Sequence, residues 1–200
     1  MTAPAGRAPS GGAPSGRTLV AGVGNVFLGD DGFGSAVAQA LARRELPGGV
    51  EVADIGIRGV HLAYQLLDGY DALVLVDAVA RGEPAGTVTV LETSLAAHAR
   101  SDDAAPPVDP HDMGPDAVLR LLAGLAGTLG AAVGRVLVVG CEPASLDEGI
   151  GLSPAVEAAV PVAVGTVLDL VTTGRAPELA TGLTPDLTPD LTTGERTCTR

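Results

Sequence analysis

Three acidic residues and one histidine have the side-chain types that a chemical site requires. Asp30 and Asp31 stand together in a glycine-rich loop, and Asp77 directly follows the most apolar run of the chain. His111 lies in a polar segment that leads into a predicted helix. Carboxylate oxygens and an imidazole nitrogen can bind a divalent ion of nickel, iron, zinc or manganese, or they can act as general acids and bases without a metal. The spacing leaves both kinds of chemistry open.

Each acidic residue also has a structural interpretation. One carboxylate is enough to cap the free N–H groups at the start of a helix, so we expect Asp30 to cap and Asp31 to face the site. Asp77 could make a hydrogen bond within its own loop, because burying its charge without a partner is costly. Asp54 follows the second predicted strand and is a weaker candidate, since a turn residue suffices there.

The elements that must position these residues alternate between strands and helices. Continuous apolar runs favour buried strands, whereas apolar residues at helical spacing favour helices. We expect strands at 17–23, 50–54, 72–76, 86–91 and 135–140, and helices at 33–45, 60–67, 115–125 and 154–171. This order predicts a three-layer α/β domain, in which ligands bind beyond the carboxyl ends of the strands.

Two of the predicted helices carry more detailed signals. Ser153 followed by Pro154 is typical of a helix start, because the serine can cap and the proline fits the first turn. The helix at 60–67 has one apolar face, formed by Val60, Ala63, Leu66 and Leu67.

The two ends of the 200-residue chain differ from its middle. Residues 1–16 are a low-complexity sequence, and 174–200 contain the repeat TPDLTPDL, so we expect a disordered N-terminal arm and a C-terminal tail around one domain at 17–173. A net charge of −12, no lysine and 2% aromatic residues argue against nucleic-acid binding. No apolar run approaches the roughly 18–20 residues of a transmembrane helix. We expect a cytoplasmic monomer without membrane association.

Two common enzyme classes fit poorly. A strand leads into Gly22-Val23-Gly24, as in dinucleotide-binding folds, but Phe27 occupies the position of the third glycine, and Asp30 and Asp31 would repel a pyrophosphate. No G-x-S-x-G motif marks a serine nucleophile. Cys141 ends an apolar run, and we expect it to be a small core residue.

Five blocks of sequence, in order, resemble the nickel-iron hydrogenase maturation endopeptidases. They are Gly22-x-Gly24-Asn25 with Gly29-Asp30-Asp31-Gly32-Phe33-Gly34, then Asp54-Ile55-Gly56, Val76-Asp77-Ala78, Pro110-His111-Asp112-Met113-Gly114, and Gly140-Cys141-Glu142-Pro143 with Leu146 and Gly149 to Pro154. The resemblance spans about residues 17–172 and implies a twisted, mostly parallel five-stranded sheet with helices on both faces.

The resemblance also implies an activity. Members of this family remove a C-terminal extension from the hydrogenase large-subunit precursor once nickel has been inserted. The family's metal-binding positions fall on Asp31, Asp77 and His111, which are therefore the candidate catalytic residues and metal ligands. Nickel would be presented by the substrate, so a permanent enzyme-bound metal is not required. The chain departs from the family at Ile55 and Asp112, which leaves the hydrogenase group open.

Three other functions remain as alternatives. The domain could be a non-catalytic nickel checkpoint or escort protein that binds the loaded large subunit through the same ligands. It could be a peptidase of the same fold that cuts a different protein. A nucleotide-dependent α/β enzyme is the third alternative.

Overall fold

A five-stranded sheet forms the centre of the computed structural model, which describes residues 16–98, 118–124 and 133–174. Its strands lie in the order β2-β1-β3-β5-β4. Their bounds are β1 (Thr18–Val23), β2 (Val50–Gly56), β3 (Ala72–Ala78), β4 (Val88–Thr93) and β5 (Arg135–Cys141). Only β4 runs antiparallel among these strands, and it pairs with β5 at one edge. The structure thus confirms the mostly parallel sheet predicted from the sequence.

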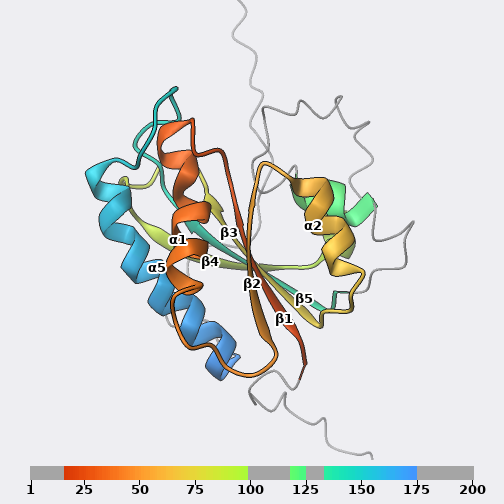
Figure 1. Cartoon of the computed structure of the whole chain (residues 1–200). Coiled ribbons are helices and arrows are strands. Elements are labelled where there is room, and N and C mark those ends of the chain that lie inside the picture. Colours follow the sequence, from red (N-terminus) through yellow and green to blue (C-terminus); the bar gives the residue numbers. More distant parts are fainter. Residues whose placement is uncertain (1–15, 99–117, 125–132, 175–200) are drawn as a thin grey trace, which may run out of the picture.

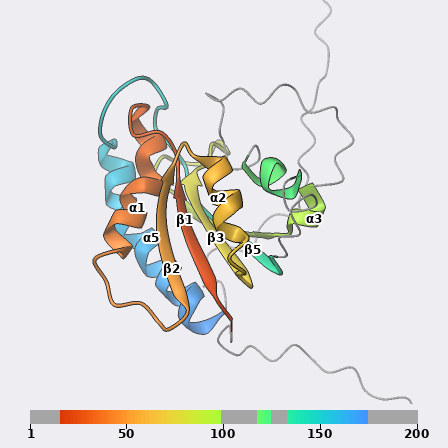
Figure 2. The same ribbon diagram turned by 45° about the vertical axis from the view of Figure 1, so that its right-hand side comes forward.

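Helices cover both faces of the sheet, which gives the predicted three layers (Figure 1). On one face, α1 (Phe33–Leu41) and α5 (Pro154–Thr173) enclose a core with the inner side chains of β1, β3 and β5. The opposite face is covered by α2 (Gly59–Leu66), α3 (Leu95–His98) and the helical residues 118–124 (Figure 2). Every residue of β1 and β3 is buried, because these central strands have a helical layer on each side.

The helix α2 turns a different face to the core from the one predicted. Its buried residues are Gly59, Leu62, Ala63 and Leu66, whereas Val60 is 53% exposed and Leu67 is 40% exposed. The prediction was wrong for these two residues because the buried positions of α2 follow the spacing i, i+3, i+4 and i+7 from Gly59, and Val60 and Leu67 lie one position outside that face. The predicted helix at 33–45 is also shorter than expected, since α1 ends at Leu41.

The helix α5 begins as predicted. The Ser153 Oγ accepts a hydrogen bond from the Val156 N–H at 3.5 Å, and Pro154 occupies the first turn. Contrary to the expectation from the sequence, α5 is long and apolar enough to cross a membrane by length and composition, with a mean hydropathy of 1.6. One side of α5 packs on the sheet, which accounts for much of its apolar character without a membrane.

Several predictions fall on parts of the chain that the structure does not describe. These are the arm at 1–15, nearly all of the tail at 174–200, and His111 with its flanking residues. The predicted helix at 115–125 is described only over 118–124, which is helical.

Candidate functional site

A close contact between α1 and the sheet brings the candidate acidic residues together. A Cβ atom at Gly34 would overlap the carbonyl oxygens of Val23 and Val76, and one at Gly22 would overlap the Gly34 carbonyl oxygen. Glycine at both positions lets the start of α1 lie directly against the carboxyl ends of β1 and β3. The preceding 3-10 turn η1 (Gly29–Gly32), which carries Asp30 and Asp31, is thereby held next to the end of β3.

Asp77 lies inside this junction, near the end of β3. The sequence placed it just after the strand, but the strand runs on to Ala78, and the side chain is only 1% exposed. Its Oδ1 accepts a hydrogen bond from the Ala78 N–H at 2.8 Å, whereas its Oδ2 has no hydrogen-bond partner within the described part of the chain. A buried carboxylate oxygen without a partner is costly, and a bound cation or a proton would remove that cost.

The neighbouring Asp31 is half-buried and faces the same junction. Its Oδ2 accepts a hydrogen bond from the Asn25 N–H at 2.6 Å. Gly24, with φ of 125°, makes this loop conformation available, since a Cβ atom there would overlap the Asp31 carbonyl oxygen. The loop that leaves β1 therefore folds back over η1 and fixes the direction of the Asp31 carboxylate.

The electrostatics of the two carboxylates are coupled. Burial raises the pKa of Asp77 well above its ordinary value, and the negative charge of Asp31 raises it further, against the lowering effect of the Ala78 N–H. Burial also raises the pKa of Asp31, against the hydrogen bond from Asn25. Two nearby acids that repel each other, one of them fully buried, are stabilised by a bound cation or by a proton.

Asp30 does not cap a helix, so the prediction of its role was wrong. Neither η1 nor α1 has a side-chain cap at its start. Instead, the buried Asp30 carboxylate accepts hydrogen bonds from the N–H groups of Ala144, Ser145 and Ser153 at 2.8, 3.2 and 2.6 Å. Burial alone would raise the pKa of Asp30, but these hydrogen bonds outweigh it and the pKa is lowered. Asp30 therefore fastens η1 to the segment that precedes α5.

Asp54 is exposed and connects β2 to α1. Its Oδ1 accepts a hydrogen bond from the Ser35 hydroxyl at 2.7 Å, and its Oδ2 accepts one from the Gln39 side-chain amide at 3.1 Å. Both oxygens are therefore occupied by side chains of α1. The structure gives Asp54 an anchoring role beyond the turn residue that the sequence indicated.

The third residue of the predicted metal site, His111, lies outside the described residues. Within residues 16–98, 118–124 and 133–174, no three His, Cys, Asp or Glu side chains come together in an arrangement that could hold a metal ion. The described part supplies the acid pair Asp31 and Asp77. Their oxygens suit a divalent cation, because one buried oxygen lacks a partner and the two charges repel each other.

Cys141 has the core role expected from the sequence. It is 1% exposed, and burial, together with the charges of Asp30 and Glu142, raises the pKa of its thiol to about 11. A thiol in this state is a poor nucleophile, because thiolate is the reactive form. Sequence reasoning gave no role to Glu142, whose carboxylate accepts hydrogen bonds from the Arg81 and Gly82 N–H groups at 2.7 and 3.1 Å. The signal available in the sequence was an acidic residue directly after the apolar run at 136–141.

Comparisons with known proteins agree on one family. The family model described as hydrogenase maturation protease matches residues 35–170. The chain is 33% identical over 154 residues to the hydrogenase 2 maturation protease of Escherichia coli, a match that covers 76% of this chain and 88% of that protein. It is 30% identical over 160 residues to the hydrogenase expression/formation protein HupD of Rhizobium leguminosarum, covering 76% and 72%.

Solved structures give the same result. The hydrogenase maturating endopeptidase HybD from E. coli matches with a TM-score of 0.62 and 30% identity, over 78% of this chain and 91% of that one. The hydrogenase 2 maturation peptidase from a Thaumarchaeota archaeon matches with a TM-score of 0.58 and 34% identity, over 78% and 97%.

Proposed function

Because the chain belongs to the hydrogenase maturation protease family, we propose that it removes a C-terminal extension from the nickel-loaded large-subunit precursor of a nickel-iron hydrogenase. The chain is a peptidase of this family. The observation that carries the finer proposal is the acid pair, in which a buried Asp77 oxygen has no hydrogen-bond partner among the described residues and repels Asp31 nearby.

In this proposal nickel is cargo of the substrate. Asp77 Oδ2 and the Asp31 carboxylate accept the positive charge that a loaded precursor presents, and His111 completes the ligand set. A loaded precursor relieves the repulsion between the two carboxylates, whereas an empty precursor leaves it in place. Docking through the metal therefore makes binding depend on correct loading.

Cleavage requires that water attack a peptide bond and lose a proton. A carboxylate of the acid pair that is not bound to nickel would accept this proton. The nickel ion, when bound, supplies positive charge next to the reacting carbonyl group. Asp30 keeps η1 fixed, so that Asp31 stays directed at the same point.

The proposal is tested by the intact mass of the cognate large-subunit precursor after incubation with this protein. We expect a C-terminal peptide to be lost from nickel-loaded precursor and not from nickel-free precursor. Loss of the peptide from both forms would show that the protein is a peptidase that does not require nickel in its substrate. Loss from neither form, for a precursor that carries an extension, would favour a checkpoint that binds the loaded subunit without cutting it.

A further inference from the structure

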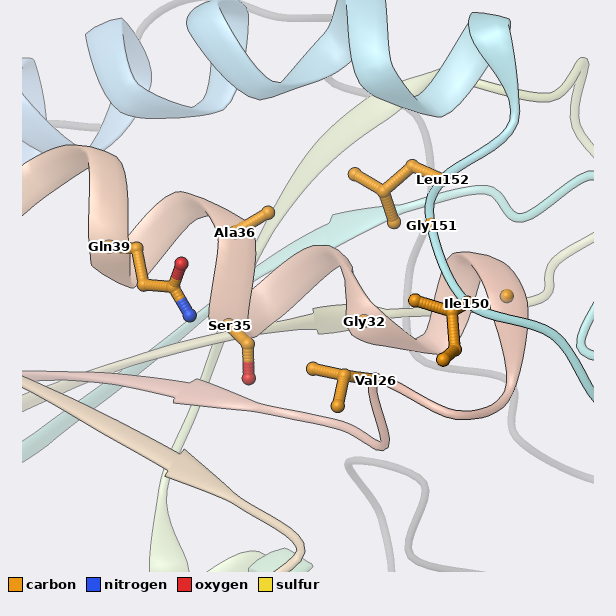
Figure 3. Close-up of a pocket in the computed structure, with 9 residues that line it drawn as sticks. Val26, Gly32, Ser35, Ala36, Gln39, Ile150, Gly151 and Leu152 are labelled. Atoms are coloured by element: carbon orange, nitrogen blue, oxygen red, sulfur yellow. The ribbon is translucent and has the colours of Figure 1, made fainter.

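A small groove lies between the start of α1 and the loop that precedes α5, and Gly32, the residue after Asp31, lines it (Figure 3). Its volume is about 170 Å³. The apolar side chains around it come from three separate segments, with Val26 from the loop after β1, Ala36 from α1, and Ile150 and Leu152 from the loop before α5. Ser35 and Gln39 line it as well, and both donate hydrogen bonds to Asp54.

The rim of this groove exposes large apolar side chains on a well-fastened support. Phe27 is 64% exposed and Ile150 is 84% exposed. Their backbones lie side by side, because the Gly149 N–H donates to the Phe27 carbonyl oxygen at 2.9 Å and the Gly29 N–H donates to the Gly149 carbonyl oxygen at 3.0 Å. Asp30 adds three hydrogen bonds to the same loop. Large exposed apolar side chains that gather beside an apolar groove are typical of a surface that binds a partner.

The size of the groove limits what it can hold. Small-molecule and cofactor sites usually enclose about 300–1,000 Å³, which is well above this volume. A cavity of about 150 Å³ holds a benzene molecule. The groove therefore suits one apolar side chain, of branched aliphatic or aromatic size.

The position of the groove favours the substrate polypeptide as the molecule that supplies this side chain. Gly32, which lines the groove, directly follows Asp31, and Val26 follows Asn25, whose N–H binds the Asp31 carboxylate. The groove and the acid pair are therefore built on the same two stretches of chain, and a polypeptide bound at the acid pair is the ligand that can extend over the groove. The exposed Asp147 and Glu148 lie on the rim loop beside Ile150, and no charged side chain lines the groove itself. This charge favours a segment with neutral or basic residues over an acidic one.

We propose that this groove is a specificity subsite, which binds an apolar side chain of the substrate polypeptide close to the bond that is cut. This inference rests on the proposed function, because it takes the acid pair as the site of cleavage. It assigns Ala36 and Ile150 to substrate selection, a role separate from nickel recognition by Asp31 and Asp77.

The first test fills the groove from the helix. Ala36→Leu places a larger side chain where the substrate residue would lie, and Ala158→Leu is its matched control, since Ala158 is exposed on α5 and does not line the groove. Cleavage of nickel-loaded precursor is followed by intact mass at several precursor concentrations. We expect Ala36→Leu to raise KM by roughly tenfold or more, which is the scale of one misfitting side chain in an apolar pocket, and Ala158→Leu to leave it unchanged.

The second test removes one wall. Ile150→Ser keeps the fold intact because the side chain is 84% exposed, and Val162→Ser on α5 is the control at another exposed apolar position, which is 51% exposed. We expect a KM increase of roughly threefold to tenfold for Ile150→Ser and none for Val162→Ser. Thermal unfolding of all four variants separates a binding defect from a folding defect. If Ala36→Leu does not fold, the KM of Ile150→Ser alone tests the subsite.

The third test changes the substrate to match. Shortening the apolar side chain nearest to the cut bond to alanine should bring the Ala36→Leu rate close to the wild-type rate on the same shortened precursor. Wild-type KM values for both Ala36→Leu and Ile150→Ser would overturn the subsite while leaving the peptidase intact. Failure of the wild-type protein to cut any loaded precursor would instead overturn the proposed function, and the subsite with it.

Discussion

Two neighbouring regions at the carboxyl edge of the sheet each bury an aspartate, Asp30 in η1 and Asp77 at the end of β3, and each residue is 1% exposed. Asp30 receives three backbone hydrogen bonds, and its pKa is lowered. Asp77 receives one, from the next residue, and its pKa is raised well above the ordinary value by burial and by Asp31. The two residues thus share a low solvent exposure but have opposite shifts of pKa.

The difference separates the two residues by role. An acid whose oxygens are supplied with N–H groups stabilises the fold as an anion and has little capacity left for a ligand. An acid buried beside another acid destabilises the fold until a cation or a proton arrives. The region around Asp30 is therefore the support, and the region around Asp77 is the candidate site.

The largest effect on stability should come from the support. Asp30→Ala leaves three N–H groups without their acceptor and should lower the free energy of unfolding by about 2–4 kcal/mol. Asp77→Asn, in contrast, removes a repelling charge and should leave the unfolding midpoint equal to that of the wild type or higher. Urea unfolding of both variants measures the difference. Equal destabilisation by the two substitutions would contradict the difference in role between Asp30 and Asp77.

The pH dependence of stability should have opposite signs for the two residues. Asp30 has a lowered pKa, so its stabilisation is present above the unfolded-state pKa, near 3.8, and is lost as the pH falls through the folded-state pKa. Asp77 has a raised pKa, so the wild type loses stability relative to Asp77→Asn as the pH rises from about 3.8 through the folded-state pKa.

Unfolding free energies of wild type, Asp30→Asn and Asp77→Asn, measured from about pH 3 to about pH 8, test both signs. The gap between wild type and Asp30→Asn should close in acid. The gap between wild type and Asp77→Asn should open toward neutral pH in favour of the variant. If rising pH favoured the wild type over both variants, or both variants over the wild type, the assignment would be contradicted.

The smallest effect concerns Cys141, which reports the charge of Asp30. Burial is the main reason that the pKa of Cys141 rises to about 11, and the negative charges of Asp30 and Glu142 add to it. In a Cys198→Ser background, Asp30→Asn should increase the thiolate fraction at a given alkaline pH by roughly twofold to threefold. Thiolate absorbance measures this fraction. An unchanged titration would show that Asp30 does not carry its charge in the folded protein.

The sequence predicted the sheet well, since its signals are local. Runs such as 72–76 are apolar throughout, and only a strand covered on both faces buries every side chain. The cap at Ser153 was predicted for the same reason. The apolar face of α2 was predicted wrongly at Val60 and Leu67, because a second set of apolar residues at helical spacing, which includes Leu62, fits the same segment, and packing on the sheet selects that set.

For the candidate site, the sequence singled out Asp31 and Asp77. It did not predict that Asp30 anchors η1 to the segment before α5. The partners of Asp30 lie more than 100 residues away along the chain, at Ala144, Ser145 and Ser153, so a local helix cap was the only role its neighbours could suggest. The groove beside Ala36 was hidden for the same reason, since its walls come from segments far apart in sequence.

The most direct test of the central claim is the rate at which Asp77→Asn cuts nickel-loaded large-subunit precursor, followed by intact mass beside the wild type. The substitution keeps the size of the side chain and removes its charge. We predict that cleavage falls by at least about a hundredfold while the variant remains as stable as the wild type. Cleavage at the wild-type rate would contradict the assignment of Asp77 to the site.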